Sequence, residues 1–441
     1  MSEAITSPFG KLPEDWSYRP VEQYTDFLTG PAFDSKRFNT DGKGPRLVRG
    51  INLTKGVTRW EDEKTKFWSH NLDGLTKYSL KEKDILIGMD GSLVGQNYAY
   101  LNQSDLPALL VQRVARIRVN GKLDSKFLYY MFGTDSWLKY VEIVKTNSGI
   151  PHISNGDIKN FVFPFPPLPE QQKIATILSS VDDVIEKTQS QIDKLKDLKT
   201  GMMQELLTKG IGHTEFKDSP VGRIPVGWDR VSIQSVTHLI TKGATPTTYG
   251  HAYTDSSGVY FYRSVNASED GTLKREDIRF ISNEANESIK RSKLQVGDIA
   301  LSIVGAKTGK TYFCVTSQAE LPANINQNVA LIRPIEERLN HRYLKYVIAS
   351  ADFQYQVDME ITTQAQPSLS LKQVGDFMIN LPPITEQMDI SDKLDSVSTL
   401  ILAKQRKMVA ISKSKKALMQ DLLTGTVRVN VDNQHKEEVV A

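Results

Sequence analysis

The chain has 441 residues, of which 39% are hydrophobic and 24% charged, a composition typical of a soluble globular protein with two or three domains. A formal net charge of +3, from 55 Lys and Arg against 52 Asp and Glu residues, excludes a uniformly basic surface, so any nucleic-acid-binding surface must be local. The single cysteine, Cys314, excludes a disulfide framework, and no apolar run or N-terminal pattern indicates a membrane helix or secretion signal, so we expect a cytoplasmic protein.

Four segments of the first half of the chain recur in the second half, with an offset between matched residues of 212 to 215. The matched segments are 7–16 with 219–228, 47–52 with 261–266, 80–85 with 294–299, and 112–118 with 327–333. A repeat of this length indicates that both halves fold into the same unit. We predict that each unit is an irregular domain followed by a long helix.

The irregular domains are predicted to be α/β (α+β). Runs of apolar, β-branched residues predict strands near 84–87, 116–119, 298–301 and 328–332. A shorter helix is predicted over 125–140, with its counterpart over 340–357. Segments that contain Gly and Asn, such as 41–44 and 266–271, are typical of loops.

A proline-led segment followed by a long helix occurs twice with a constant offset of 216 residues, beginning at Phe165 and again at Leu381. The first copy contains Pro166-Pro167-Leu168-Pro169-Glu170-Gln171 and ends at Gly210, and the second contains Pro382-Pro383-Ile384-Thr385-Glu386-Gln387 and ends at Gly425. Apolar residues recur at spacings of three and four, as in a coiled-coil seam. The predicted helix-pair core is Ile174, Leu178, Val181, Ile185, Ile192 and Leu195 with Ile390, Leu394, Val397, Ile401, Met408 and Ile411, and the first stripe continues through Leu198.

The charges along these two stripes favour an antiparallel pair. Each helix carries acidic residues early, such as Asp182 and Asp395, and lysines late, such as Lys199 and Lys415. Antiparallel packing places acid against base at both ends, whereas parallel packing places like charges together. The alternative is that each helix only covers its own domain.

The doubled proline segment, each copy followed by Glu-Gln and by a helix that ends in a Leu-Leu-Thr segment, resembles the specificity subunit of type I restriction-modification systems over essentially the whole chain. The resemblance implies five segments. They are target-recognition domain 1 (1–164), a central conserved helix (165–211), target-recognition domain 2 (212–381), a C-terminal conserved helix (382–427) and a tail (428–441).

What the resemblance implies is a non-catalytic subunit that recognises DNA. In this family each recognition domain reads one half of a bipartite, asymmetric target, and the helices set the spacing and dock two methylation subunits. Motor-nuclease subunits join for restriction. S-adenosylmethionine, ATP and Mg²⁺ belong to those partners, and no cofactor is expected on this chain. Whether the partners separate or fuse methylation and cleavage stays open.

Motifs that would point to an enzyme are incomplete. Gly305 to Thr311 has three residues between its glycines, where a phosphate-binding P-loop needs four, and a strand-like segment follows. The seven histidines have no metal-ligand spacing, so no metal site is predicted. The competing interpretation is a coiled-coil scaffold that organises enzyme subunits without reading DNA.

Candidate DNA contacts follow from side-chain chemistry alone, because Arg pairs with guanine and Asn or Gln with adenine. The candidates in the first half are Lys43, Arg46, Arg49, Asn52, Lys55, Arg59 and Gln112. Those in the second half are Lys242, Arg263, Asn266, Lys307, Lys310, Gln327 and Asn328. The alternative for the matched Arg and Asn pairs is a structural role in supporting a turn.

Overall fold

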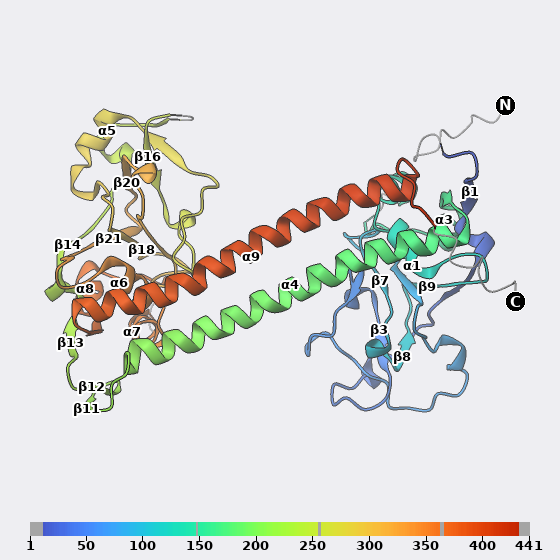
Figure 1. Cartoon of the computed structure of the whole chain (residues 1–441), viewed down its shortest axis with the longest axis horizontal. Helices are drawn as coiled ribbons and strands as arrows, with labels where there is room; N and C mark the ends of the chain where they lie inside the picture. Colours follow the sequence, from blue (N-terminus) through green and yellow to red (C-terminus); the bar gives the residue numbers. More distant parts are fainter. Residues whose placement is uncertain (1–11, 147–148, 255–256, 362–365, 432–441) are drawn as a thin grey trace, which may run out of the picture. The chain divides into compact units, whose positions relative to one another are not determined.

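The computed structural model describes residues 12–146, 149–254, 257–361 and 366–431. The chain divides into two compact units: unit 1 combines residues 1–189 with 406–441, and unit 2 comprises residues 190–405 (Figure 1). Each unit contains one mixed domain of helices and strands and one half of each long helix, α4 (Leu168–Lys209) and α9 (Ile384–Thr424). The predicted fold class, two repeated domains with two long antiparallel helices, is confirmed.

A four-stranded antiparallel sheet with the order β2-β9-β6-β7 forms the centre of unit 1. Its strands are β2 (Thr25–Thr29), β9 (Val114–Val119), β6 (Ile85–Gly88) and β7 (Tyr98–Tyr100). The two-stranded pairs are β3 (Arg46–Val48) with β8 (Ala108–Leu110), β4 (Leu53–Thr54) with β5 (Val57–Thr58), and β1 (Ser17–Pro20) with β10 (Val162–Phe165). The short helices are α1 (Ser125–Met131), α2 (Asp135–Val144) and α3 (Asn155–Asn160).

Unit 2 repeats this plan with the sheet order β14-β21-β18-β19. Its strands are β14 (Thr237–Lys242), β21 (Val329–Pro334), β18 (Ile299–Ser302) and β19 (Tyr312–Cys314). A second sheet has the order β15 (Tyr253–Thr254), β17 (Arg279–Ile281), β16 (Val259–Tyr262) and β20 (Ala323–Ile325). The remaining pairs are β11 (Phe216–Ser219) with β12 (Gly222–Pro225) and β13 (Asp229–Ser232) with β22 (Met378–Leu381). The short helices are α5 (Asn283–Ser288), α6 (His341–Ile348), α7 (Ala351–Ile361) and α8 (Leu371–Asp376).

The four predicted strands correspond to β6, β9, β18 and β21, but the prediction of one helix over 125–140 and one over 340–357 is wrong. Each is a pair of helices, α1 with α2 and α6 with α7. A new N-cap starts the second helix in each pair. The Thr134 hydroxyl accepts a hydrogen bond from the backbone N–H of Trp137, and the Ser350 hydroxyl accepts one from Phe353. Hydroxyl side chains favour such starts over the helix interior.

The repeated Glu-Gln of the proline segments connects each long helix to its domain. Gln171 is fully buried; its side-chain oxygen accepts from the N–H of Asp124 and its amide donates to the carbonyl of Pro166, both at 2.8 Å. Gln387 makes the same contacts with Asn340 and Pro382, at 2.9 and 2.8 Å. Because a buried amide that loses its partners costs stability, the motif fixes the start of both long helices.

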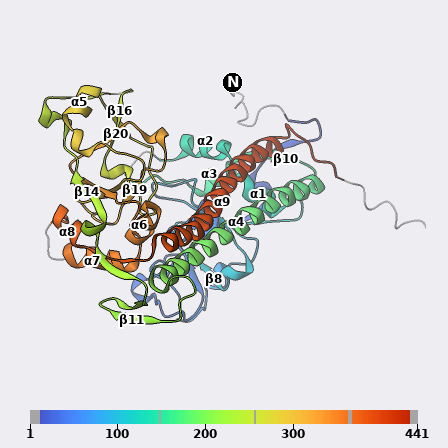
Figure 2. The same ribbon diagram turned by 60° about the vertical axis from the view of Figure 1, so that its left-hand side comes forward.

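Within each unit the two long helices lie side by side and antiparallel, the start of one beside the end of the other (Figure 1; Figure 2). Lys415 of α9 bonds to Asp182 of α4 at 2.5 Å in unit 1, as the charge pattern predicts. In unit 2 the predicted pairing between acidic residues of α9 and lysines of α4 is not seen for two of the carboxylates. There Asp392 and Asp395 of α9 bond to Arg342 of α6 and not to lysines of α4.

The predicted helix-pair core falls into two groups. Six of its residues are buried: Ile174, Leu178, Ile192, Ile390, Leu394 and Ile401. Val181, Ile185, Leu195, Val397, Met408 and Ile411 are half-buried. Ile174 and Leu178 lie in the hydrophobic core of unit 1, and Ile390 and Leu394 in that of unit 2, so both helices also cover their domains. Placing Leu198 in the stripe was wrong, because 52% of it is exposed.

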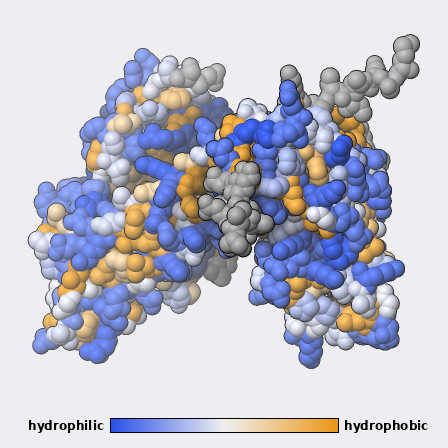
Figure 3. All heavy atoms as spheres, turned by 45° about the vertical axis from the view of Figure 1, so that its right-hand side comes forward, coloured by the Kyte–Doolittle hydropathy of each residue, from blue (hydrophilic) through white to orange (hydrophobic). Residues whose placement is uncertain are grey.

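Polar side chains cover most of the face shown in Figure 3, and apolar side chains lie in separate patches. In the parts of the chain that the structure describes, no helix is long and apolar enough to cross a membrane.

Candidate nucleic-acid interface

A matched short turn follows the first strand of the parallel pair in each unit. In unit 1 it is the 3-10 turn Gly50–Asn52, and in unit 2 it is Ser264–Asn266. Asn52 is fully buried; its side-chain oxygen accepts from the N–H of Arg49 at 3.2 Å, and its amide donates to the carbonyls of Arg59 and Lys64. Asn52 therefore builds the turn with its whole side chain.

Asn266 has the same role in unit 2. It is fully buried, accepts from the N–H of Arg263 at 3.0 Å, and donates to the carbonyls of Lys274 and Glu276 at 3.2 and 3.0 Å. A buried amide with its donors and acceptor occupied has none left for a base edge. For both asparagines the structure therefore shows a turn-supporting role, which the sequence analysis had kept as an alternative.

The arginines of the two turns are also bonded within their own units. Arg49 donates to the carbonyl of Lys64, and burial lowers the pKa of its guanidinium. Arg263 donates to the carbonyl and the carboxylate of Asp277, both at 2.7 Å. The middle residue of each turn points outward instead: Ile51 is 46% exposed and Val265 is 57% exposed.

Parallel strand pairing places a second turn beside each of these. β3 runs parallel to β8, and β16 to β20, so the carboxyl ends of both strands in a pair lie at the same edge. Gln112 and Arg113 follow β8, and Gln327 and Asn328 follow β20. All four are exposed or half-exposed. The structure therefore brings together segments about 60 residues apart in sequence, which no local pattern could show.

A third loop, after the central strand of each main sheet, completes the edge. The N–H of Met89 donates to the carbonyl of Arg113 at 2.9 Å, and that of Ile303 to Asn328 at 2.9 Å. These bonds join the loops 90–96 and 304–310 to the second turns. We call the three segments 49–52, 90–96 and 112–113 edge 1, and the segments 263–266, 304–310 and 326–328 edge 2.

Most of the basic candidates of unit 2 belong to edge 2. Lys307 forms an ion pair with Glu269, and Lys310 with Asp358 at 3.0 Å; both lysines lie in the loop 304–310. Lys242 ends β14 opposite Ala330, two residues after Asn328, so it borders the same edge. The strand β19 that follows this loop begins at Tyr312, in agreement with the strand that the sequence predicted in place of a P-loop helix.

The basic candidates of unit 1 are divided. Arg59 donates to the carbonyl of Ile51 at 2.8 Å, and the N–H of Lys55 donates to the carbonyl of Gln96 at 3.0 Å, so both border edge 1. Arg46 begins β3 and donates to the carbonyl of Ser104. Lys43 precedes it and pairs with Asp41. These last two lie at the amino end of β3, away from the turn at its carboxyl end.

Three residues of the edges were missed by sequence reasoning. Arg113 is 59% exposed in its side chain, has a positive φ of 69°, and pairs with Asp90 at 3.2 Å. The internal repeat could have identified Arg113, because it aligns with the candidate Asn328. Ile51 and Val265 also align, but an isolated aliphatic residue carries no sequence signal of exposure.

The two edges share a backbone but offer different side chains. Edge 1 presents Gln112 with Arg113, whereas edge 2 presents Gln327 with Asn328. Leu93 of the edge 1 loop aligns with Lys307. Amide, guanidinium and aliphatic groups are those that hydrogen-bond base edges or contact the thymine methyl group. Among the described residues no group of three His, Cys, Asp or Glu could hold a metal ion.

Comparisons with known proteins identify the family of this chain. A family model described as the type I restriction modification DNA specificity domain matches residues 13–197 and again 225–411. The MjaVIII specificity subunit of Methanocaldococcus jannaschii is 28% identical over 356 residues, which cover 79% of this chain and 80% of the relative. The EcoAI specificity subunit of Escherichia coli is 33% identical over 182 residues, 41% of this chain and 30% of that relative.

Solved structures show the same fold. The S subunit of a type I restriction-modification system from M. genitalium superposes with a TM-score of 0.59 at 15% identity, over 95% of this chain and 99% of that one. Because the family model matches both halves, in the two regions that carry edges 1 and 2, the chain belongs to the family of type I restriction-modification DNA specificity subunits.

Proposed function

We propose that edge 1 and edge 2 each read one half of a bipartite, asymmetric DNA target. The observation that carries this proposal is the pairing of one repeated backbone with unequal side chains at the same three loops. Two copies of one scaffold fit two half-sites, and unequal side chains fit unequal half-sites. The chain supplies recognition, and methylation and cleavage belong to partner subunits that use S-adenosylmethionine, ATP and Mg²⁺.

The long helices suit a spacing role in this proposal. Each has just over 40 residues, because α4 spans Leu168–Lys209 and α9 spans Ile384–Thr424. At 1.5 Å per residue such a helix is ~60 Å long. In this proposal the helices also dock two methylation subunits, with motor-nuclease subunits joining the full complex.

Mapping of adenine methylation in host DNA tests the function directly. With this chain and its methylation partner expressed together, we expect a split motif, two short defined sequences around an undefined spacer. The motif should disappear when this chain is deleted. Methylation partners that bind the chain but leave no chain-dependent motif would favour the scaffold interpretation.

Substitution of edge 2 tests which side chains read the target. The double variant Gln327→Ala/Asn328→Ala should bind the mapped duplex about tenfold more weakly in fluorescence anisotropy, because one bidentate amide-to-base contact contributes about 1–3 kcal/mol. Only the half of the motif read by unit 2 should lose definition. The backbone bond from Ile303 to the carbonyl of Asn328 is unaffected by the change.

Gln318→Ala is the matched control for this variant. Gln318 is exposed in unit 2, but it precedes β20 and lies at the end opposite edge 2. We expect its affinity to equal that of the unmodified chain. Equal losses in both variants, or loss of definition in both half-sites, would contradict the assignment of edge 2 to one half-site.

A further inference from the structure

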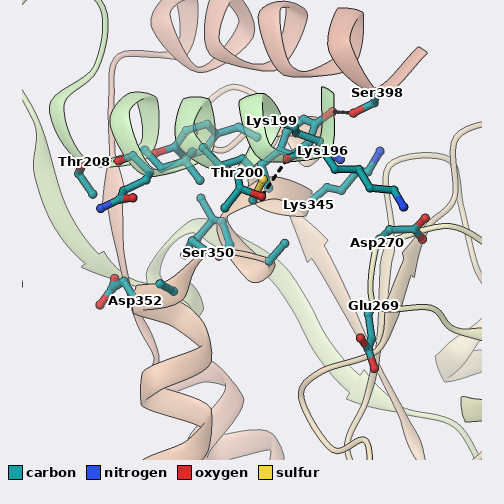
Figure 4. A pocket seen from close by; sticks show the side chains of 18 of the residues that line it. Lys196, Lys199, Thr200, Thr208, Glu269, Asp270, Lys345, Ser350, Asp352 and Ser398 are labelled. Atoms are coloured by element: carbon teal, nitrogen blue, oxygen red, sulfur yellow. Dashed lines mark hydrogen bonds between the residues drawn. The ribbon is translucent and has the colours of Figure 1, made fainter. Parts of the chain in front are cut away.

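A cavity of about 710 Å³ lies within unit 2. No residue of edge 2 lines it, although Glu269 in its wall pairs with Lys307 of edge 2. Its walls come from the second half of α4, the first half of α9, α6, the β11–β12 hairpin and the loop 269–272 (Figure 4). Cavities of this size commonly bind small molecules. Nothing in the proposed reading of DNA uses it.

Three lysines gather at one end of the cavity, Lys196 and Lys199 from α4 and Lys345 from α6 (Figure 4). The ammonium groups of Lys199 and Lys345 both lie over the ring of Tyr346, 5.4 and 5.2 Å from its centroid. Within the described residues, none of the three lysines has a carboxylate oxygen within 4.0 Å. Two cations on one ring repel each other, and a ring face offsets that repulsion only in part.

The carboxylates that line the cavity are already bonded elsewhere. Glu269 pairs with Lys307, and Asp352 accepts two hydrogen bonds from Arg230 at 3.0 and 3.2 Å. Asp270 accepts hydrogen bonds from its neighbours Ser268 and Thr272 and lies nearest the lysines in Figure 4. Three ammonium groups therefore share the cavity with one carboxylate that has no basic partner of its own.

Burial lowers the pKa of Lys199, and the charge of Lys345 lowers it further, while Asp270 and Asp395 act in the opposite direction. The folded chain thus holds a half-buried cation beside a second one. A bound anion would reduce the electrostatic repulsion between these two ammonium groups.

The equivalent lysine of unit 1 has a carboxylate partner. Lys415 aligns with Lys199 and pairs with Asp182 at 2.5 Å, and the hydroxyl of Tyr130 donates to the same carboxylate at 2.7 Å. Unit 2 has Ser398 where unit 1 has Asp182, and Lys345 where unit 1 has Tyr129. The carboxylate that accepts from Tyr346 in unit 2 is Asp395, which aligns with Ser179 and pairs with Arg342 at 3.0 Å. Lys199 therefore lacks the carboxylate partner that Lys415 has in unit 1, and Lys345 adds a second lysine beside it.

We infer that this cavity binds a small phosphate-bearing molecule of about nucleotide size. The three ammonium groups suit a multiply charged phosphate, because lysine is a point-charge donor to phosphate oxygens. The remainder of the wall includes Met203, Leu207, Ile224 and Ile401, which suit a planar apolar group such as a base. The inference does not depend on which DNA sequence the edges read.

Titration calorimetry of the full-length chain tests the inference with ATP, inorganic pyrophosphate and adenosine as probes. ATP and pyrophosphate should bind, and adenosine should bind at least tenfold more weakly than ATP. The double variant Lys199→Gln/Lys345→Gln should bind ATP at least tenfold more weakly than the unmodified chain. Lys196→Gln, a change at an exposed position that does not threaten folding, should weaken ATP binding about threefold.

Lys415→Gln is the matched control, because it removes the equivalent lysine of unit 1, and it should leave ATP binding unchanged. Circular dichroism checks the fold of each variant, and Lys196→Gln decides the outcome if the double variant unfolds. The inference is overturned if no phosphate-bearing probe binds below millimolar concentration, or if Lys196→Gln binds ATP as the unmodified chain does. It is also overturned if a short DNA duplex displaces ATP fully, because the cavity would then be a contact for the DNA backbone.

Discussion

Asp298→Asn is expected to lower the free energy of unfolding of unit 2 by about 3 kcal/mol, the scale measured when one partner of a buried ion pair is removed. Asp298 is 1% exposed; it accepts two hydrogen bonds from the guanidinium of Arg333, both at 2.7 Å, and one from the N–H of Gln295. Bonding to Asp298 raises the pKa of Arg333. Asn keeps the shape but loses the charge, which leaves Arg333 partly buried without its counter-ion.

Hydrogen exchange measured by mass spectrometry would show where the Asp298→Asn variant loses stability, and we expect the loss in β18 and β21. Lys372→Gln, which breaks an exposed pair with Asp376 in the same unit, should change stability by less than about 0.5 kcal/mol. The repeat offers a second check, because Asp84 makes the equivalent pair with Arg118 at 2.6 and 2.7 Å in unit 1. Asp84→Asn should therefore destabilise unit 1 in the same way. An Asp298→Asn variant as stable as Lys372→Gln would contradict this account.

Arg428→Met is the second change with a large expected effect, again about 3 kcal/mol, in unit 1. Glu170, at the start of α4, is 2% exposed and accepts from Arg428 at 2.7 and 2.8 Å and from the indole N–H of Trp16 at 2.9 Å. Arg428 also bonds Asp15 at 2.8 and 2.7 Å. Without Arg428 the buried carboxylate keeps only a neutral donor among these partners. Urea unfolding followed by circular dichroism measures the change.

The loss of stability at acidic pH gives an independent measurement of the contacts made by Arg428. The hydrogen bond from Arg428 holds the pKa of Asp15 below its ordinary value. A carboxyl whose pKa is depressed by folding stabilises the protein above its unfolded pKa, and this contribution is lost as the pH falls through the folded pKa. Arg428→Met should therefore flatten the loss of stability below about pH 4.

The repeat supplies the control for Arg428 as well. Glu386 in unit 2 accepts from the indole N–H of Trp228 and from the N–H of Ile211, both at 2.9 Å, and contacts His213 at 2.8 Å. His213→Gln removes one partner but leaves the other two in place. We expect it to cost less than about 1 kcal/mol. If both variants lose the same stability, the buried ion pair is not what distinguishes unit 1.

Single side chains show where sequence reasoning reached its limit. Asn52 and Asn266 were found as a matched pair, but only burial and hydrogen bonding show that they build turns. Gln112 was found, while its neighbour Arg113 was missed, although the repeat aligns it with Asn328. Its position at edge 1 depends on the contact from the separate loop at Met89. The unpaired lysines of the cavity could not be found from the sequence, because Asp395, which accepts from Tyr346, pairs with Arg342 of α6 and not with Lys199.

The sequence by itself determined the repeat, the long helices, their antiparallel direction and the family resemblance, because these depend on periodicity, spacing and charge order along one chain. Only the tertiary structure decided which residues meet at edges 1 and 2, because parallel pairing joins strands about 60 residues apart. It also decided that Glu170, which is buried, and Glu386, which is half-buried, are the matched acceptors of the two halves, through partners as distant along the chain as Arg428. Side-chain burial and long-range hydrogen bonds arise from packing, which a linear pattern does not encode.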